Sequence, residues 1–196
     1  RNEDGYSPEW VRRSKRAMST VIPRFNTRRQ VYDYAQGIYY PSARHASRLA
    51  EHDFAGARAL ADWKQRVRAA WSKVSLRVIE EAPSDMPRGE RLRLRIAAGL
   101  NGLQPSDVRV EFVARRQLPE STFEPPALSS YHDGSREGLW TEQLNPTGEH
   151  DGGDGAAVFA LDAQPMECGQ FATEVRVYPW HELLKHPFEV GLMKRL

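Results

Sequence analysis

Residue types that bind metal ions occur in two places in this sequence, and neither pattern is complete. Asp151 and Asp154 lie three positions apart in a glycine-rich stretch that follows His150. A calcium loop needs oxygen ligands at alternating positions and a bidentate acid farther along, and no glutamate follows here at that distance. His181 and His186 lie five positions apart, and no cysteine or further histidine accompanies them. We therefore expect a polar turn at the first place, structural or surface histidines at the second, and no metal site.

The other reactive residues do not assemble a catalytic site. Cys168 has no histidine or other base beside it, which an activated thiol nucleophile requires. Glu80 and Glu81 are adjacent, so their side chains face different directions. No glycine-rich loop has a recognised phosphate-binding spacing. We expect no catalytic residue and no cofactor-binding residue in this chain.

Two aromatic side chains, Trp140 and Tyr131, are candidates for contact with a carbohydrate. They lie in or beside expected strands and loops, and a flat apolar ring with a polar edge can stack on a sugar. A tryptophan in a folded domain more often packs in the core. Both interpretations therefore stay open, and glycan stacking is a hypothesis for these two residues.

Composition limits the classes of protein to which the chain can belong. Its 196 residues, 40% of them hydrophobic, suffice for one domain or for a small domain with a helical segment. No run of 18 apolar residues and no secretory signal occur, and Cys168 is the single cysteine. These features favour a cytoplasmic protein that does not span a membrane. Arg1 in place of an initiating methionine indicates that a segment was removed or that this is a piece of a longer protein.

The charges are unevenly distributed along the chain. Residues 1–77 contain 16 lysines and arginines against 7 acids, whereas residues 78–196 contain 12 against 19. Such asymmetry can signal a nucleic-acid partner, but no binding motif accompanies it. We expect neither a nucleic acid nor a membrane as partner, and interpret the first part as a basic helical segment that rests against part of a larger protein.

Start and stop signals predict two helices at the beginning of the chain. A Ser-Pro pair favours the start of a helix over residues 9–21, and Pro23 ends it. Thr27 and Gln30 have the spacing of a capping box. The second helix therefore begins at Thr27, and we expect it to close at Pro41.

A third helical stretch covers residues 43–73, in one piece or two. One face of this stretch carries an apolar stripe formed by Leu49, Leu60, Trp63, Val67 and Trp71, and the other faces are basic. A basic amphipathic helix can bind a membrane surface or a partner protein. We favour docking on its own domain.

The hydrophobic period changes from 3.6 to 2 at Val74, which predicts strands from there onward. The alternating segments cover residues 74–78, 91–96, 108–112, 139–144, 157–161 and 171–178. Turn signals separate them. The predicted fold is α+β, an N-terminal helical segment followed by an immunoglobulin-like antiparallel β-sandwich. The expected domains are terminal helices (1–42), a connecting amphipathic helix (43–73) and the β-sandwich (74–196).

Two groups of motifs stand out in this chain. Within residues 1–41 they are RNEDG, PEWVRR, PRFNTRR, VYDY and YYP, and later in the chain they are LQPSDVRVE at 103–111, VRVYPWH at 175–181 and EVGL at 189–192. The first group resembles the end of the catalytic region of a bacterial α-glucan (glycogen or maltodextrin) phosphorylase. The second group is similar to the C-terminal extension of the long members of that glycosyltransferase family.

The resemblance implies a parent enzyme that cleaves α-1,4-glucan with phosphate to release glucose 1-phosphate. The parent holds pyridoxal phosphate on a lysine in a GTSNMK-like motif, which is absent from this chain. None of the five lysines, Lys15, Lys64, Lys73, Lys185 and Lys194, has such neighbours. The resemblance therefore implies an inactive C-terminal fragment, with no cofactor of its own.

The resemblance also implies partners. The fragment would serve as a structural, oligomerisation or glucan-holding domain of the parent, in contact with its catalytic domains. We expect the apolar side chains of the first helices to lack their cover, and a homo-oligomer to form through them: Trp10, Met18, Ile22, Phe25, Val31 and Tyr34. The alternative is a free-standing carbohydrate-binding or protein-interaction module.

Overall fold

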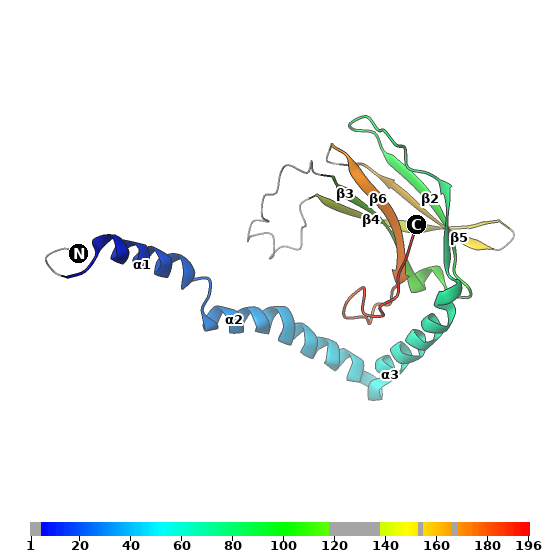
Figure 1. The fold of residues 1–196 in the computed structure, drawn as a ribbon. Coiled ribbons are helices and arrows are strands. Elements are labelled where there is room, and N and C mark those ends of the chain that lie inside the picture. The colour runs from blue at the N-terminus through cyan, green and yellow to red at the C-terminus, as the bar shows by residue number, and fades with distance from the viewer. Residues whose placement is uncertain (1–4, 118–137, 153–154, 166–167) are drawn as a thin grey trace. The chain divides into compact units, whose positions relative to one another are not determined.

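The structure is a computed structural model that describes residues 5–117, 138–152, 155–165 and 168–196. The chain divides into two compact units, Arg1–Ala57 and Arg58–Leu196. We call these the helical unit and the sheet unit. Figure 1 follows the chain from the helices of the first unit, in blue and cyan, to the strands of the second.

The first helix, α1, covers Pro8–Val21, one residue earlier at its start than the sequence predicted. Ser7 has an extended backbone, and its hydroxyl accepts a hydrogen bond from the backbone N–H of Trp10 at 3.4 Å. Proline is suited to the first helical position because its missing N–H would have no partner there. The helix ends just before Pro23, as expected.

The second helix, α2, covers Thr27–Tyr34, and Asn26 rather than Thr27 caps it. Asn26 is extended (φ −114°, ψ 151°), and its side-chain oxygen accepts a hydrogen bond from the Arg29 N–H at 2.9 Å. The predicted capping box was therefore wrong by one residue. The asparagine prevails because its amide also donates to the Ile22 carbonyl at 2.9 Å, which holds it in the capping position.

The helical conformation does not close at Pro41, so that prediction was wrong. A π-helical turn, η1 (Ala35–Tyr39), leads directly into α3 (Tyr40–Ala70). The backbone N–H of Tyr40 bonds to the carbonyl of Ala35, five residues earlier. Proline inside a helix lacks an N–H and crowds the carbonyl four residues before it, and the wider π turn accommodates both constraints.

Helix α3 consists of two pieces, one of the two predicted arrangements. Glu51 is extended (φ −57°, ψ 148°), and His52, Asp53 and Phe54 have positive φ values of 51°, 55° and 61°. Left-handed backbone is uncommon for residues other than glycine. No glycine or proline occupies these four positions, so the sequence does not mark the place of the turn.

The sheet unit begins with the second piece of α3, whose buried residues are Leu60, Trp63, Val67 and Ala70. A short 3-10 turn, η2 (Trp71–Lys73), leads into the sheet, and a second, η3 (Pro105–Asp107), precedes the third strand. The strands are β1 (Ser75–Glu80), β2 (Leu92–Gly99), β3 (Val108–Arg116), β4 (Leu139–Asp151), β5 (Ala156–Ala163), β6 (Phe171–Pro179) and β7 (Lys194–Arg195). All six predicted strands are present, and β7 was not predicted.

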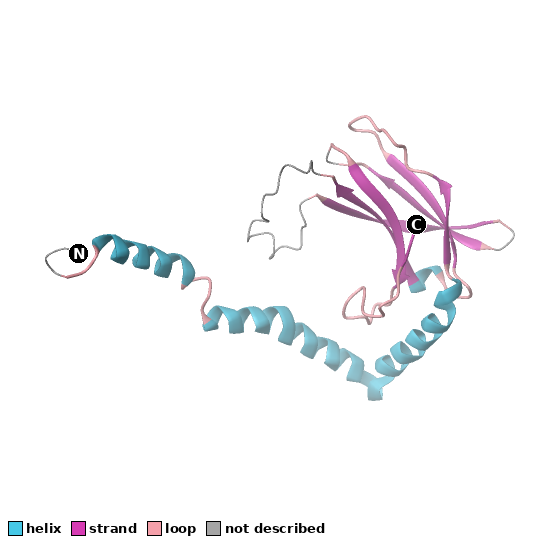
Figure 2. Ribbon diagram, in the orientation of Figure 1, coloured by secondary structure: helices cyan, strands magenta, loops and turns pink. Residues whose placement is uncertain are grey.

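All strand pairs are antiparallel, in the order β1-β2-β5-β4-β3-β6-β7. The first half of β4 pairs with β3, and its second half pairs with β5. Lys194 on β7 donates to the Ser72 carbonyl at 2.9 Å and to the Val74 carbonyl, which brings the two edges of the sheet together. The strands, magenta in Figure 2, thus form one curved, nearly barrel-shaped sheet. An α+β fold is confirmed, whereas this topology does not establish an immunoglobulin-like sandwich.

The core of the sheet unit lies where α3 and the strands meet. Its largest fully buried side chains include Phe159, Ile96, Leu144 and Val110 from four strands and Val67 from α3. The second piece of the amphipathic helix therefore docks on the sheet unit, as we favoured, whereas Leu49 of the predicted stripe lies in the helical unit and is not buried. Among the described residues, no helix combines the length and the apolarity needed to cross a bilayer.

Candidate functional site

The helical unit exposes most of its large apolar side chains. Helices α1, α2 and η1 contain no buried residue. The side chains expected to lack cover are exposed: Trp10 and Phe25 by 70%, Val31 by 63%, Ile22 by 58%, Met18 by 55% and Tyr34 by 45%. On α1, the spacing of Trp10, Met18 and Val21 places them on one face of the helix. The expected exposure of these side chains is confirmed. Contiguous apolar surface of this kind is typical of a site that contacts another molecule.

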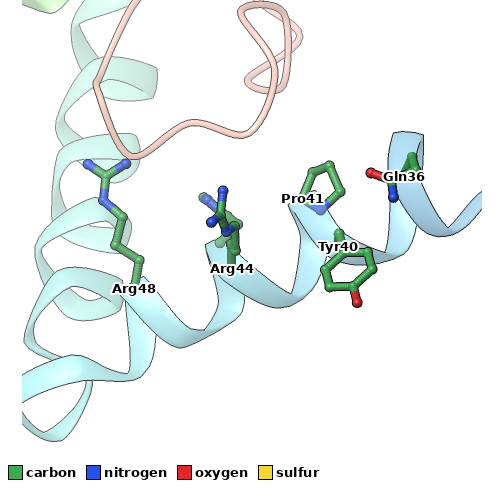
Figure 3. Close-up of a pocket in the computed structure, with 6 residues that line it drawn as sticks. Gln36, Tyr40, Pro41, Arg44 and Arg48 are labelled. Atoms are coloured by element: carbon green, nitrogen blue, oxygen red, sulfur yellow. The ribbon is translucent and has the colours of Figure 1, made fainter.

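A basic groove lies on the helical unit, where η1 meets α3. It has a volume of about 640 Å³ and is lined by Gln36, Tyr40, Pro41, Arg44, His45 and Arg48. Figure 3 shows Arg44 and Arg48 projecting from the same side of the helix, one turn apart. Both side chains are exposed, while His45 is half-buried. The sequence reasoning did not single out this groove, although the four-residue spacing of two arginines on one helix was a signal.

Arg13 on α1 and Arg29 on α2 have an acid partner on their own helix, whereas Arg12, Arg16 and Arg28 have no ion pair among the described residues. Arg13 pairs with Glu9 at 2.6 Å, and Arg29 pairs with Asp33 at 2.5 Å, each one turn away. Within the part of the chain that the structure describes, no carboxylate pairs with Arg44 or Arg48. The groove therefore presents two guanidinium groups with unused donors.

The two candidate histidines close local turns in the sheet unit. The Nδ1 atom of His181 accepts the Leu183 N–H at 3.1 Å, and that of His186 accepts the Phe188 N–H at 3.1 Å. The ring of His181 also lies 5.0 Å from the ring of Trp63. No group of three potential metal ligands is found among the described residues.

At the glycine-rich stretch after His150, strand β4 ends at Asp151, and the described glycines Gly152 and Gly155 are in turn conformation. Asp151 forms an ion pair with Arg77 on β1, and Asp154 lies outside the described residues. Cys168 is exposed. The ion pair gives Asp151 a structural partner on β1.

The candidate sugar-binding residues are only partly described. Trp140 is half-buried on β4, where its ring meets the ring of Phe112 edge-on at 5.5 Å. Its indole N–H donates to the Glu142 carboxylate at 3.0 Å. Tyr131 lies outside the described residues. An indole that is half-exposed beside a carboxylate offers a sugar both an apolar face and an acceptor for hydroxyl groups.

Asp107 is the buried carboxylate that connects α3 to the sheet, and the sequence reasoning assigned it no role. Its side chain accepts the indole N–H of Trp63 at 2.8 Å and the backbone N–H of Gln104 at 2.8 Å. Arg66 lies 3.7 Å away on the exposed side. The Gln104–Asp107 spacing is that of a capping box at η3, which was a readable local signal. The contact with Trp63, 44 residues earlier, was not.

A second polar network joins β3 to β6. Arg176 donates two hydrogen bonds to one Glu111 oxygen, at 2.9 and 2.8 Å, and Tyr178 donates to the other oxygen. Burial, and then the hydrogen bond to the Glu111 carboxylate, raise the pKa of Tyr178 above its ordinary value. The network satisfies its own donors and acceptors, so it acts as a structural tie between strands.

Comparison with known proteins identifies the family. The family model for the glycogen phosphorylase C-terminal domain matches residues 71–196. The chain belongs to this family. The resemblance seen in the sequence is confirmed by a match that begins at η2 and covers the whole sheet.

Individual phosphorylases match over almost the whole chain. Glycogen phosphorylase of Mycobacterium tuberculosis (strain H37Rv) is 28% identical in an alignment of 196 positions that covers 98% of this chain and 21% of that protein. Maltodextrin phosphorylase of Thermococcus litoralis is 28% identical in an alignment of 188 positions that covers 94% of this chain and 20% of that protein. The chain thus spans about a fifth of the length of these relatives. No solved structure matches it significantly.

The described lysines do not fit the cofactor that the family resemblance implies. Pyridoxal phosphate is held as a Schiff base on a lysine, inside a cavity with donors for the phosphate. Lys15, Lys73 and Lys185 are exposed. Lys64 pairs with Glu189 at 2.5 Å, and Lys194 donates to backbone carbonyls at the sheet edge. No step of a reaction is therefore assigned to this chain.

Proposed function

We propose that this chain is the C-terminal part of an α-glucan phosphorylase and is inactive by itself. The parent would cleave α-1,4-glucan with phosphate in the cytoplasm, using pyridoxal phosphate held elsewhere. The family match and the length of the relatives support this parentage. The immunoglobulin-like type of the sheet unit remains part of this proposal.

The function of the chain within the parent is to cover and hold the catalytic region. The observation that carries this proposal is the exposure of the helical unit, in which α1, α2 and η1 bury nothing. The sheet unit, in contrast, has its own core. A unit without a core that displays Trp10, Phe25 and Val31 supports a role as a docking element.

The test uses the polypeptide encoded directly upstream of Arg1, supplied as a separate chain. We expect the two chains to elute together and the isolated chain to release no glucose 1-phosphate. The variant Phe25→Asp should weaken the complex strongly, because it places a charge in the apolar contact. The matched control Ile79→Asp changes a side chain of the sheet unit that is 38% exposed and should leave the complex intact.

Two outcomes would contradict the proposal. One is stoichiometric pyridoxal phosphate bound through a lysine of the isolated chain, which would make it a cofactor-binding domain. The other is the absence of a phosphorylase reading frame upstream, or of any complex with its product.

A second candidate function is retention of the glucan by Trp140. The half-exposed indole beside Glu142 favours it. In a native gel that contains glycogen, we expect Trp140→Ala to abolish any retardation of the chain. Trp180→Ala is the matched control, because Arg109 lies 3.4 Å above the Trp180 ring and occupies its face. Equal retardation of all three proteins, or none, would rule out Trp140 as a glucan contact.

A further inference from the structure

The two arginines of the basic groove indicate the chemistry of the surface that covers the helical unit. We propose that this partner surface, contributed by the catalytic region of the phosphorylase, is acidic as well as apolar, and that its carboxylates pair with Arg44 and Arg48. The inference rests on the proposed function and specifies how the docking is achieved.

The first argument is the local pairing of charges. Arg44 and Arg48 have no ion pair among the described residues, because Tyr40 and His52 occupy the positions four residues before and after them, and Glu51, three residues after Arg48, lies where the helix is interrupted. Arg12, Arg16 and Arg28 also lack an ion pair, but they do not line the groove. Planar guanidinium groups bind carboxylates through two parallel hydrogen bonds, so this pair is suited to acids supplied by another surface.

The second argument is the charge of the whole helical unit. Residues 1–57 contain 10 lysines and arginines against 6 acids, a net charge of +4. The rest of the chain contains 18 against 20, a net charge of −2. Interfaces are arranged so that a positive surface meets a negative one. An acidic partner surface complements the helical unit, whereas a basic one would be repelled.

The third argument is the shape of the groove and its surroundings. From Tyr40 to Arg48 the groove follows α3 for about 12 Å at 1.5 Å per residue, which suits several groups on a macromolecule better than one small anion. Tyr40 and Pro41 line it with apolar surface, and Ile38 and Tyr39 next to it are 50% and 63% exposed. Interfaces with nucleic acids are more polar than interfaces between proteins. The apolar residues in and beside the groove therefore favour a protein surface as its partner.

The experiment measures binding between this chain and the polypeptide encoded upstream of Arg1 at low and high salt. The variant R44E/R48E should bind roughly tenfold more weakly at low salt, because like charges then face each other. Its affinity should also depend less on salt, since screening acts over about 10 Å at 0.1 M and about 3 Å at 1 M. R44Q/R48Q, which removes the charge and has a helix propensity close to that of arginine, should have an intermediate effect.

The control variant R68E/R88E changes the net charge by the same amount in the sheet unit. Arg68 and Arg88 are exposed and have no ion pair among the described residues. We expect its affinity to stay near that of the unchanged chain. Helix content by circular dichroism must match in all four proteins, and R44Q/R48Q carries the test if R44E/R48E is misfolded.

Each outcome supports or overturns the inference. If the unchanged chain does not bind, both the proposed function and this inference fail. If it binds and both R44E/R48E and R44Q/R48Q bind equally well, only this inference fails. The inference also fails if R68E/R88E weakens binding as much as R44E/R48E does. It fails as well if R44E/R48E abolishes self-association of the chain, or its binding to RNA, and leaves the complex with the upstream polypeptide unaffected.

Discussion

At the residue scale, Asp107 combines burial with contacts from two different elements. Its carboxylate accepts hydrogen bonds from the Trp63 indole on α3 and from the Gln104 backbone, and only 12% of its side chain is exposed. A buried donor that loses its acceptor costs about 1–3 kcal/mol. The residue therefore stabilises the junction of helix and sheet more than any surface ion pair would.

We predict that Asp107→Ala lowers the free energy of unfolding by about 1–3 kcal/mol. Urea denaturation followed by tryptophan fluorescence measures this loss. The matched control is Asp162→Ala, whose side chain is 52% exposed and pairs with Arg91 at 2.5 Å. Exposed pairs contribute about 0–1 kcal/mol, so equal losses in the two variants would contradict the role of Asp107.

Tyr178 gives the chain a pH dependence that is specific to this residue. Its pKa is raised in the folded state, by burial first and by Glu111 second. An unfolded tyrosine ionises near pH 10, so above that pH the unfolded chain releases a proton that the folded chain retains. The stability from this group is thus fully present below about pH 10 and declines as the pH rises toward the folded pKa.

We predict that the stability difference between the unchanged chain and Tyr178→Phe shrinks above about pH 10. At pH 8 the variant should be less stable by about 0.5–1.5 kcal/mol, since it loses one hydrogen bond. Urea denaturation from pH 8 to pH 11 tests this. Tyr32→Phe, at a side chain that is 64% exposed, should be about as stable as the unchanged chain at pH 8. A constant difference for Tyr178→Phe would show that its pKa is not raised.

At the element scale, α1 and α2 differ from the strands because nothing packs on them. Neither helix contains a buried side chain, although α2 continues through η1 into α3, and most helical stability in proteins comes from tertiary packing of an apolar face. In the monomer we predict weak amide protection in α1 and α2 and strong protection in β2, β3 and β6. Hydrogen exchange detects the contrast, and uniformly strong protection of residues 9–39 would contradict it.

At the scale of the whole molecule, the two units should differ in autonomy. Residues 58–196 contain both the sheet and the helical piece that buries Leu60, Trp63 and Val67. We predict that this segment alone unfolds cooperatively, with a stability within about 1 kcal/mol of that of the full chain, because the helical unit adds no core.

A second truncation tests the role of that helical piece. Residues 71–196, the extent of the family match, lack Trp63 and its bond to Asp107. Loss of one large buried side chain costs about 3–5 kcal/mol, so this shorter segment should be strongly destabilised or unfolded. If it is as stable as residues 58–196, α3 is not part of the core.

The sequence by itself determined the local elements of this protein. The alternation of apolar residues located all six predicted strands, because one face of each strand is buried whatever its neighbours are, although β4 extends to Asp151, seven residues beyond its predicted end. Pro8 and Pro23 bounded α1 through the chemistry of their own backbone. The motifs near both ends carried the family assignment, and the incomplete spacing of His181, His186 and Asp151 predicted structural roles.

Only the tertiary structure decided how these elements are joined. The strand order, the division of β4 between two neighbours and the two-residue strand β7 depend on pairing between distant segments, for which a local period contains no information. The same holds for the Asp107–Trp63 contact, since a buried carboxylate is explained only by the donor that reaches it. The basic groove exists only because the helix continues past Pro41. The proline alone predicted the end of the helix there, and the π turn η1, which precedes Pro41, allows the helix to continue.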